Sequence, residues 1–313
     1  MRIAILGATS QIARDLVAHM VPGPHELVLY ARAPQRVRDW LAVSGSSGRC
    51  EVAAMADFGQ SAAFDAVINF VGVSDPARAA AMGATIMEVT RRHDELVLAH
   101  LARHPACRYI FLSSGAIYGG SFDAPVDDAS VATLPVNDIR PQHWYGIAKL
   151  AAECVHRCLP DRAIVDLRVF SYFSRNQDLE SRLLMADAMR AILAGTVLQT
   201  SDDVAVRDYI HPSDLHRLVE AVLAGPRMNT ALDVCSRAPV DKQPLLTALR
   251  DSLGLRYEST PAATSVNATG AKRHYYSLSR RAQTLGWAPE HDSLAGILLE
   301  ARALLAAHAK GRA

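Results

Sequence analysis

Short apolar segments alternate with helical patterns through the first 170 residues of this chain of 313 residues. Apolar residues stand at consecutive positions in these segments, which is typical of strands buried on both faces. The predicted strands are Arg2–Leu6, Glu26–Tyr30, Cys50–Ala54, Ala66–Val71, Arg108–Ser113 and Ile164–Phe170. The predicted helices are Ser10–Met20, Pro34–Val43, Ala77–Arg103 and Trp144–Cys158. This alternation predicts an α/β fold with a doubly wound parallel sheet.

The pattern becomes less regular after residue 170, where a helical pattern at Leu179–Ala194 and the segment Val206–Asp214 are the clearest features. We therefore predict a sheet domain at residues 1–170 and a smaller C-terminal lobe at residues 171–313. We expect the chain to cross between the two more than once. Ligands of open parallel sheets bind outside the carboxyl ends of the strands, so functional residues are expected there.

The composition excludes several classes of function. Lys and Arg total 33 and Asp and Glu total 32, so a net charge of +1 indicates no surface for nucleic acid or an anionic membrane. No segment approaches the ~18 consecutive apolar residues of a membrane span, and the N-terminal residues lack the pattern of a signal peptide. We expect a cytoplasmic protein with a small-molecule substrate.

The five cysteines include no Cys-x-x-Cys pair, which favours neither a disulfide framework nor a zinc ribbon. Cys154 and Cys158 lie four residues apart on a predicted helix, as do His100 and His104 on another. This spacing can begin a metal site, but no third ligand is evident near either pair. We therefore predict no metal site.

The first strand runs into the first helix through Gly7-Ala-Thr-Ser-Gln-Ile-Ala13. A tight turn at this position directs backbone N–H groups and the helix N-terminus at a pyrophosphate. Gly7 can adopt dihedral angles that other residues resist, although Ser10 and Gln11 stand where a middle glycine is usual. An ordinary strand-to-helix turn is the alternative. We predict dinucleotide contacts from Gly7, Thr9, Ser10, Gln11 and Ile12.

The second strand is followed by Arg32, with Arg36 a turn later. A carboxylate at this position would bind the ribose 2′-hydroxyl of NAD, whereas a cation suits a 2′-phosphate, so we predict NADP, with NAD as the alternative cofactor. A solvated arginine at a helix start is the other interpretation of Arg32. Asp57 is a candidate for the adenine amino group, or a helix cap. Phe58 and Val71 complete the predicted cofactor contacts.

Tyr145 and Lys149 lie four residues apart on a predicted helix, which places both side chains on one face. Ser113 and Ser114 end the fifth predicted strand, at the edge of the sheet where ligands bind. A free tyrosine has a pKa of about 10, too high for a base near neutral pH. We predict that the Lys149 ammonium and an oxidised nicotinamide lower the pKa of Tyr145, while Ser114 holds the substrate oxygen. An amphipathic helix with a surface lysine is the alternative.

Several segments together resemble the extended short-chain dehydrogenase/reductase family, in particular its nucleotide-sugar epimerases and dehydratases. These segments are Gly7–Ala13, Phe111–Gly119, Pro141–Glu153, Arg207–Leu215 and Leu285–Pro289 followed by Ser293-Leu294. The resemblance implies a Rossmann domain that binds NAD(P) at residues 1–170 and a lobe that holds the sugar nucleotide. It also implies that Ser114, Tyr145 and Lys149 are catalytic.

The resemblance further implies that Arg207 contacts a substrate diphosphate, with Lys272 or Arg273 as a second contact. An ion pair with Asp208 is the alternative for Arg207. Relatives pair through the helix that carries the Tyr-Lys motif, which makes a homodimer an expectation. The apolar stripe on that helix could instead belong to the core; it consists of Ile147, Leu150, Ala151 and Cys154.

The sequence departs from the family pattern at several positions. Gly115 and Ala116 stand where dehydratases carry an Asp-Glu pair, which argues against sugar dehydration. Tyr172–Arg175 replaces the usual Gly-Pro, and Thr90 replaces an expected asparagine. We expect C4 epimerisation or reduction of a 4-keto sugar, and the NADP prediction favours reduction. The alternatives are a reductase of a small carbonyl compound without a diphosphate and a regulator that senses NADP without chemistry.

Overall fold

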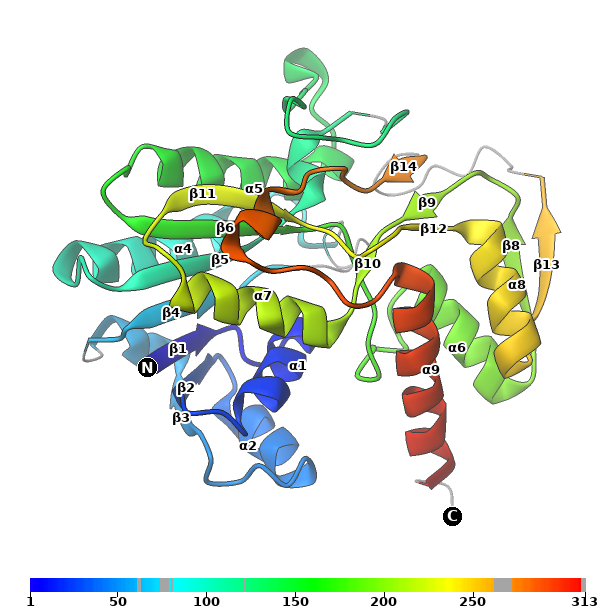
Figure 1. Cartoon of the computed structure of the whole chain (residues 1–313), viewed down its shortest axis with the longest axis horizontal. Helices are drawn as coiled ribbons and strands as arrows, with labels where there is room; N and C mark the ends of the chain where they lie inside the picture. The colour runs from blue at the N-terminus through cyan, green and yellow to red at the C-terminus, as the bar shows by residue number, and fades with distance from the viewer. Residues whose placement is uncertain (61–62, 74–78, 80, 121, 262–271, 311–313) are drawn as a thin grey trace.

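A parallel sheet forms the centre of the computed structural model, which describes residues 1–60, 63–73, 79, 81–120, 122–261 and 272–310 (Figure 1). Its order is β11-β6-β5-β4-β1-β2-β3, and each neighbouring pair is parallel. The strands are β1 Arg2–Leu6, β2 Glu26–Ala31, β3 Glu51–Ala54, β4 Ala66–Asn69, β5 Arg108–Ser114, β6 Ala163–Val169 and β11 Asn229–Val234. The predicted fold class, a doubly wound α/β sheet, is confirmed.

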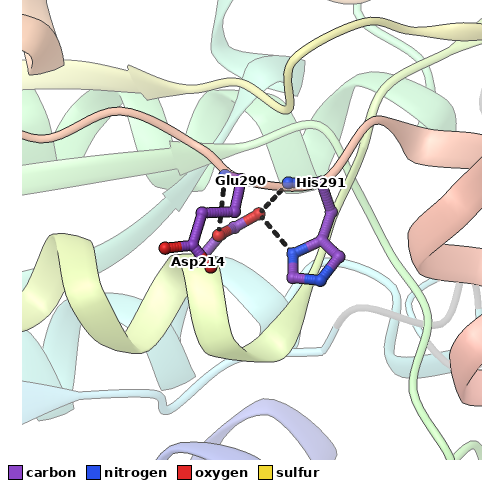
Figure 2. Close-up of side chains that lie close together, drawn as sticks. All are labelled: Asp214, Glu290 and His291. Atoms are coloured by element: carbon purple, nitrogen blue, oxygen red, sulfur yellow. Dashed lines mark hydrogen bonds and ion pairs between the residues drawn. The ribbon is translucent and has the colours of Figure 1, made fainter.

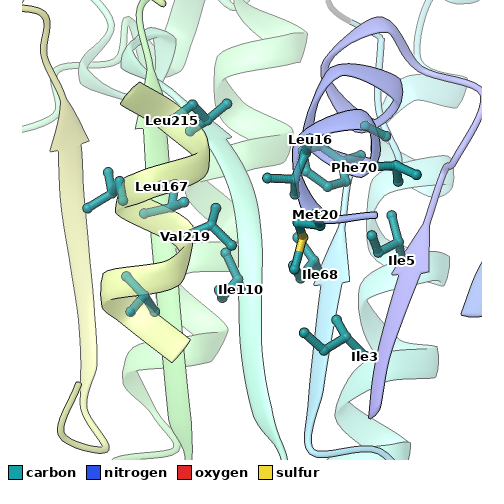
Figure 3. Close-up of a cluster of buried hydrophobic side chains, with 14 of the residues drawn as sticks. Ile3, Ile5, Leu16, Met20, Ile68, Phe70, Ile110, Leu167, Leu215 and Val219 are labelled. Carbon is teal, nitrogen blue, oxygen red and sulfur yellow. The ribbon is translucent and has the colours of Figure 1, made fainter. Parts of the chain in front are cut away.

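Helices cover both faces of this sheet. They are α1 Gln11–Met20, α2 Pro34–Val43, α4 Thr85–Arg103, α5 Pro141–Arg157 and α7 Pro212–Ala224. Side chains of β1 alternate between the faces: Ile3 and Ile5 lie in the apolar cluster with α1, α2 and α7 (Figure 3), whereas Leu6 lies in the cluster with α4 and α5. The strands are therefore apolar on both faces because helices bury both.

Two predicted helices differ from their expected bounds. The helix predicted at Ala77–Arg103 is interrupted: Ala79, Ala81 and Met82 are helical, Gly83 takes a positive φ of 56°, and α4 begins at Thr85. Residues 74–78 and 80 lie outside the described residues. The helix predicted from Leu179 is α6, Leu184–Ala194. The Ser181 hydroxyl donates to the backbone carbonyl of Asp178, which forms a turn and delays the helix.

The C-terminal lobe has its own apolar cluster, which three helices form: α6, α8 Lys242–Leu253 and α9 Ser293–Lys310. The small strands of the lobe are β7 Ser171–Tyr172, β8 Val197–Ser201, β9 Val206–Arg207, β10 Tyr209–Ile210, β12 Val240–Asp241, β13 Arg256–Thr260 and β14 His274–Tyr275. Short 3₁₀ turns are η1 Met55–Gln60, η2 Gly115–Tyr118, η3 Val136–Asp138 and η4 Arg281–Leu285. No helix in the described ranges is long and apolar enough to cross a membrane.

The chain returns to the large sheet after it has entered the lobe. Helix α7 packs on the face that α1 covers, and β11 pairs with β6 in register from Asn229 to Val234, which makes β11 the edge strand. Asp214 of α7 is fully buried and accepts hydrogen bonds from the backbone N–H groups of Glu290 and His291, both at 3.0 Å (Figure 2). Since those residues lead into α9, this carboxylate joins the sheet domain to the last helix of the lobe.

Candidate active site

The turn after β1 requires a glycine. Gly7 has a φ of +76°, and a Cβ atom there would lie 3.0 Å from the backbone of Phe70 and Val71. The backbone N–H groups of Thr9, Gln11 and Ile12 have no acceptor among the described residues. This arrangement leaves N–H donors at the helix start beside the carboxyl ends of β1 and β4, which suits a phosphate.

The side chains of the turn have different surroundings. Ser10 caps α1 by accepting the Ala13 N–H at 3.3 Å. The amide of Gln11 donates to Ser174 Oγ at 2.9 Å, in the segment after β7. Thr9 is exposed, whereas Ile12 packs partly buried against the core. The side chains of Ser10, Gln11 and Ile12 are therefore already engaged within the protein. A pyrophosphate would be bound mainly by their backbone N–H groups.

The predicted adenosine contacts lie along the ends of β2, β3 and β4. Arg32 and Asp57 are exposed. Phe58 is fully buried, and its ring centroid lies 5.2 Å from that of Tyr30. Its side chain therefore belongs to the core, and a cofactor could contact only its backbone. The backbone N–H of Val71 donates to the Asn69 side chain at 2.9 Å, which holds the chain where β4 ends.

Ser114 is the last residue of β5 and is buried. Tyr145 lies on α5, and its phenol interacts electrostatically with the Ser114 hydroxyl. Gly146 makes this approach feasible, because a Cβ atom there would lie 2.5 Å from the backbone oxygen of Ala116. The glycine thus lets α5 pack closely against η2, which brings the predicted serine and tyrosine together.

Lys149 lies deeper on the same helix, with 3% of its surface exposed. Its ammonium donates to the Leu112 carbonyl at 2.7 Å and lies 4.3 Å from the centre of the Phe111 ring. A Cβ atom on Gly72, just beyond β4, would be 3.2 Å from Nζ. Burial lowers the pKa of Lys149 to about 8, against the opposing effect of the Asp94, Asp166 and Glu153 carboxylates.

The predicted depression of the Tyr145 pKa is not present in the protein alone. Burial raises the pKa of Tyr145, and the interaction with the Ser114 hydroxyl opposes that rise. The Lys149 ammonium is directed at the Leu112 carbonyl. A lower phenol pKa therefore requires a further positive charge, such as the oxidised nicotinamide included in the prediction.

The lobe contributes two cations to this region. Arg207 of β9 pairs in register with Tyr275 of β14, and its guanidinium carbon lies 5.8 Å from the centre of the Tyr275 ring. Lys272 Nζ lies 4.3 Å from the same ring, and Arg207 donates to the Lys272 carbonyl at 2.6 Å. Neither Arg207 nor Lys272 forms an ion pair with a carboxylate within the described part of the chain. We call Arg207 and Lys272 the cation pair.

The two groups of the cation pair are desolvated, and burial lowers the pKa of both. Burial lowers the pKa of Lys272 to about 8, and the neighbouring Arg207 charge lowers it further. Asp208, the alternative partner of Arg207, instead accepts the backbone N–H of Ser236 at 2.9 Å. Of the two residues predicted as a second diphosphate contact, Arg273 is exposed, whereas Lys272 lies beside Arg207 and the Tyr275 ring.

Tyr275 is a residue of this site that the sequence analysis did not find. Its hydroxyl lies 3.2 Å from Ser114 Oγ, and its ring packs against Phe122 and Phe170. The run of basic and aromatic residues from Lys272 to Tyr276 is the sequence feature that could have indicated its role. Tyr275 thus contacts both the catalytic serine candidate and the cation pair.

Comparison with known proteins gives a family and related enzymes. Residues 3–234 match the model of the NAD dependent epimerase/dehydratase family. The UDP-glucose 4-epimerase of Streptococcus mutans serotype c is 28% identical over 225 residues, 64% of this chain and 64% of that protein. The UDP-glucose 4-epimerase of Halalkalibacterium halodurans is 26% identical over 220 residues, 63% of either chain. The chain thus matches just under two thirds of the length of these relatives.

Solved structures share the fold. The UDP-glucose 4-epimerase of Bifidobacterium longum, in complex with NAD+ and UDP, has a TM-score of 0.78 at 18% identity over 99% of this chain and 100% of its own. The dTDP-glucose 4,6-dehydratase of Bacillus anthracis, in complex with NAD, has a TM-score of 0.79 at 13% identity, covering 98% of this chain and 97% of its own. Since the family model spans most of the sequence, this chain belongs to the NAD dependent epimerase/dehydratase family.

Proposed function

We propose that this protein is an NAD(P)-dependent oxidoreductase that acts on a nucleotide sugar, by reduction of a 4-keto sugar or by epimerisation at C4. One observation carries the proposal: Ser114 and Tyr145 meet at the carboxyl edge of the sheet, and Tyr275 connects them with the cation pair. A proton-transferring cluster next to an anion site suits a sugar linked to a diphosphate.

Ser114 and Tyr145 handle the proton at the reacting oxygen. Ser114 holds the C4 oxygen, and Tyr145 accepts its proton when the alcohol is oxidised or returns a proton when the ketone is reduced. Hydride transfer would be supplied by a nicotinamide cofactor, which the turn at Gly7 and the side chains of Tyr145 and Lys149 would hold. Lys149, beside the backbone of Gly72, supplies a positive charge that favours the phenolate and a donor for the nicotinamide ribose.

The cation pair is assigned to the substrate diphosphate. Arginine offers planar, paired donors for phosphate oxygens, and lysine adds a mobile charge. The curated relatives are UDP-glucose epimerases by name, and one structural neighbour holds UDP, which supports a uridine nucleotide. Dehydration is not part of the proposal: a Cβ atom on Gly115 would lie 2.4 Å from the Phe170 ring, so an acidic side chain does not fit there.

NADP is the proposed cofactor, with NAD as the alternative. Arg32 and Arg36 are both exposed where β2 leads into α2, and their charge suits a 2′-phosphate. The structural neighbours named above hold NAD, so this assignment depends on the two arginines. Binding of each dinucleotide to the purified protein, measured by calorimetry, distinguishes the cofactors.

A cytoplasmic homodimer belongs to the same proposal. All five cysteines are free, and Cys154 and Cys158 are exposed, which is in keeping with a reducing compartment. Ala151 and Cys154 face solvent on α5, whereas Leu150 packs partly buried against the aromatic cluster around Tyr275. The exposed part of this stripe suits a partner subunit, and sedimentation analysis gives the mass that tests it.

Turnover of candidate nucleotide sugars tests the proposed function. We expect the purified protein to interconvert UDP-glucose and its C4 epimer, or to reduce a UDP-4-keto-hexose with NADPH, as followed by anion-exchange chromatography. Tyr145→Phe removes the proton-carrying hydroxyl, and we expect kcat to fall at least about 100-fold with an unchanged Tm. Tyr257→Phe, in β13, is the matched control. No conversion by the wild-type protein, or full activity of Tyr145→Phe, would contradict the proposal.

A further inference from the structure

Tyr275 reaches Ser114 from the C-terminal lobe. Its strand, β14, belongs to the small sheet β12-β9-β14 of the lobe, whereas Ser114 ends a strand of the large sheet. The ring is held by packing: its centroid lies 4.9 Å from that of Phe122 and 5.2 Å from that of Phe170, both in edge-to-face geometry. The hydroxyl is therefore held in place 3.2 Å from Ser114 Oγ.

The hydroxyl of Ser114 has a single proton to donate and two lone pairs that accept. The Ala116 backbone N–H donates to Ser114 Oγ at 3.2 Å. The Tyr275 hydroxyl lies at 3.2 Å from this oxygen, and the Tyr145 phenol interacts with it electrostatically. The serine proton points at whichever of the two phenols does not donate to Ser114.

Tyr275 has the properties of the donor. It is 8% exposed, and burial raises its pKa far above the ordinary value of a tyrosine. The phenol therefore keeps its proton throughout the neutral range. A hydroxyl that receives the Tyr275 proton on one lone pair has its own proton free for Tyr145.

We infer that Tyr275 is a positioning residue for Ser114: by donating to Ser114 Oγ, it directs the serine proton at Tyr145 and, with substrate bound, at the reacting oxygen. The inference deepens the proposed function and rests on it for the substrate step. The orientation of Ser114 itself does not depend on which substrate is turned over.

Steady-state kinetics test the role in turnover. Tyr275→Phe keeps the ring between Phe122 and Phe170 and removes the hydroxyl. We expect kcat to fall about 10-fold, the equivalent of one hydrogen bond, with KM changed less than about twofold. Tyr276→Phe, one residue along the chain, is the matched control and should change neither. Equal activity of Tyr275→Phe and the wild type would overturn the inference.

A double-mutant cycle tests whether Tyr275 acts through Ser114. In a Ser114→Ala background, Tyr275→Phe should have no further effect on kcat, because the group that it positions is gone. A further loss of the same size in that background would mean that Tyr275 acts independently of Ser114, and the inference would be wrong.

Crystal structures of the wild type and Tyr275→Phe provide a test without turnover. We expect Ser114 Oγ to contact Tyr145 in the wild type and to rotate away from it in the variant. An unchanged Ser114 rotamer, still bonded to Tyr145, would overturn the inference. If the wild type turned over no nucleotide sugar, the proposed function would fail, while this comparison would still decide the role of Tyr275.

Discussion

The two walls of the active site are built in different ways. Ser114, Tyr145 and Lys149 come from one strand end and the helix that follows it, and their positions depend on the parallel sheet and the close packing at Gly146. The opposite wall, with Arg207 and Tyr275, comes from distant segments joined by the two-residue pairing of β9 and β14. We call these the sheet wall and the lobe wall.

Each wall contains a lysine with a pKa of about 8; Lys149 is buried and Lys272 is half-buried. Burial is the main cause in both cases. Carboxylates oppose the effect at Lys149, whereas the Arg207 charge adds to it at Lys272. The sheet wall thus contains its own counter-charges, while the lobe wall is left with positive charge that an anionic ligand can neutralise. We therefore expect the sheet wall to carry out the proton transfer and the lobe wall to bind the anionic part of the substrate.

Lys149→Met should have the largest effect and tests the sheet wall. Loss of the ammonium removes the positive charge beside Tyr145, and we expect kcat to fall about 100-fold or more, with a smaller change in the KM of the nucleotide sugar. Lys272→Met is the matched control, because it should raise KM while kcat changes little. If the two variants showed the same pattern, the division of labour between the walls would be wrong.

Arg207→Ala should have the next largest effect and tests the lobe wall. Charge-assisted hydrogen bonds to phosphate contribute about 1.5–3 kcal/mol, so KM for the nucleotide sugar should rise by about 10-fold to 100-fold. The neighbouring exposed Arg273→Ala should leave KM unchanged, as measured in the same assay. An unchanged KM in Arg207→Ala would favour a small carbonyl substrate without a diphosphate.

Arg32→Ala tests the cofactor side of the sheet wall. We expect the Kd for NADP to rise about 10-fold, since a contact to the 2′-phosphate is lost. Binding of NAD should not change, which makes NAD the internal control in calorimetry. Equal weakening of both cofactors, or of neither, would mean that Arg32 is a solvated helix residue.

The smallest expected effect is on the pH dependence of anion binding. Lys272 has a lowered pKa of about 8, so it is charged below that pH and loses its proton as the pH rises through it. UDP affinity should therefore be highest below about pH 8 and weaken about 5-fold above it, the range of a partly exposed ion pair. Calorimetry of UDP binding measures this change, and Lys272→Gln should abolish it. A pH dependence retained in Lys272→Gln would assign the titration to another group.

Most of the sheet domain could be predicted from the sequence, because buried parallel strands are continuous apolar runs. The strand β1 at Arg2–Leu6 and the helix α2 at Pro34–Val43 were predicted with the observed bounds. The interruption before α4 could not be predicted from periodicity, since it depends on the positive φ of Gly83. The turn before α6 could not be predicted from periodicity either, because it depends on the hydrogen bond from Ser181 to the Asp178 carbonyl.

The sheet wall was also predictable, because spacing on a helix and the end of a strand determine where Tyr145, Lys149 and Ser114 lie. In the lobe wall, the resemblance identified Arg207 and left Lys272 and Arg273 as alternatives. Tyr275 was missed, because a pairing of two residues leaves no periodic pattern in the sequence. The buried side chain of Phe58 shows the same limit, since sequence alone did not separate a core ring from a ligand contact.

The pairing of β11 with β6 has a consequence for synthesis of the protein. Ribosomes release the chain from its N-terminus, so strands β1 to β6 emerge before residues 229–234 exist to cover the open edge at β6. During that interval an apolar strand edge is accessible to other nascent chains. We expect the nascent protein to depend on chaperones until Val234 has emerged.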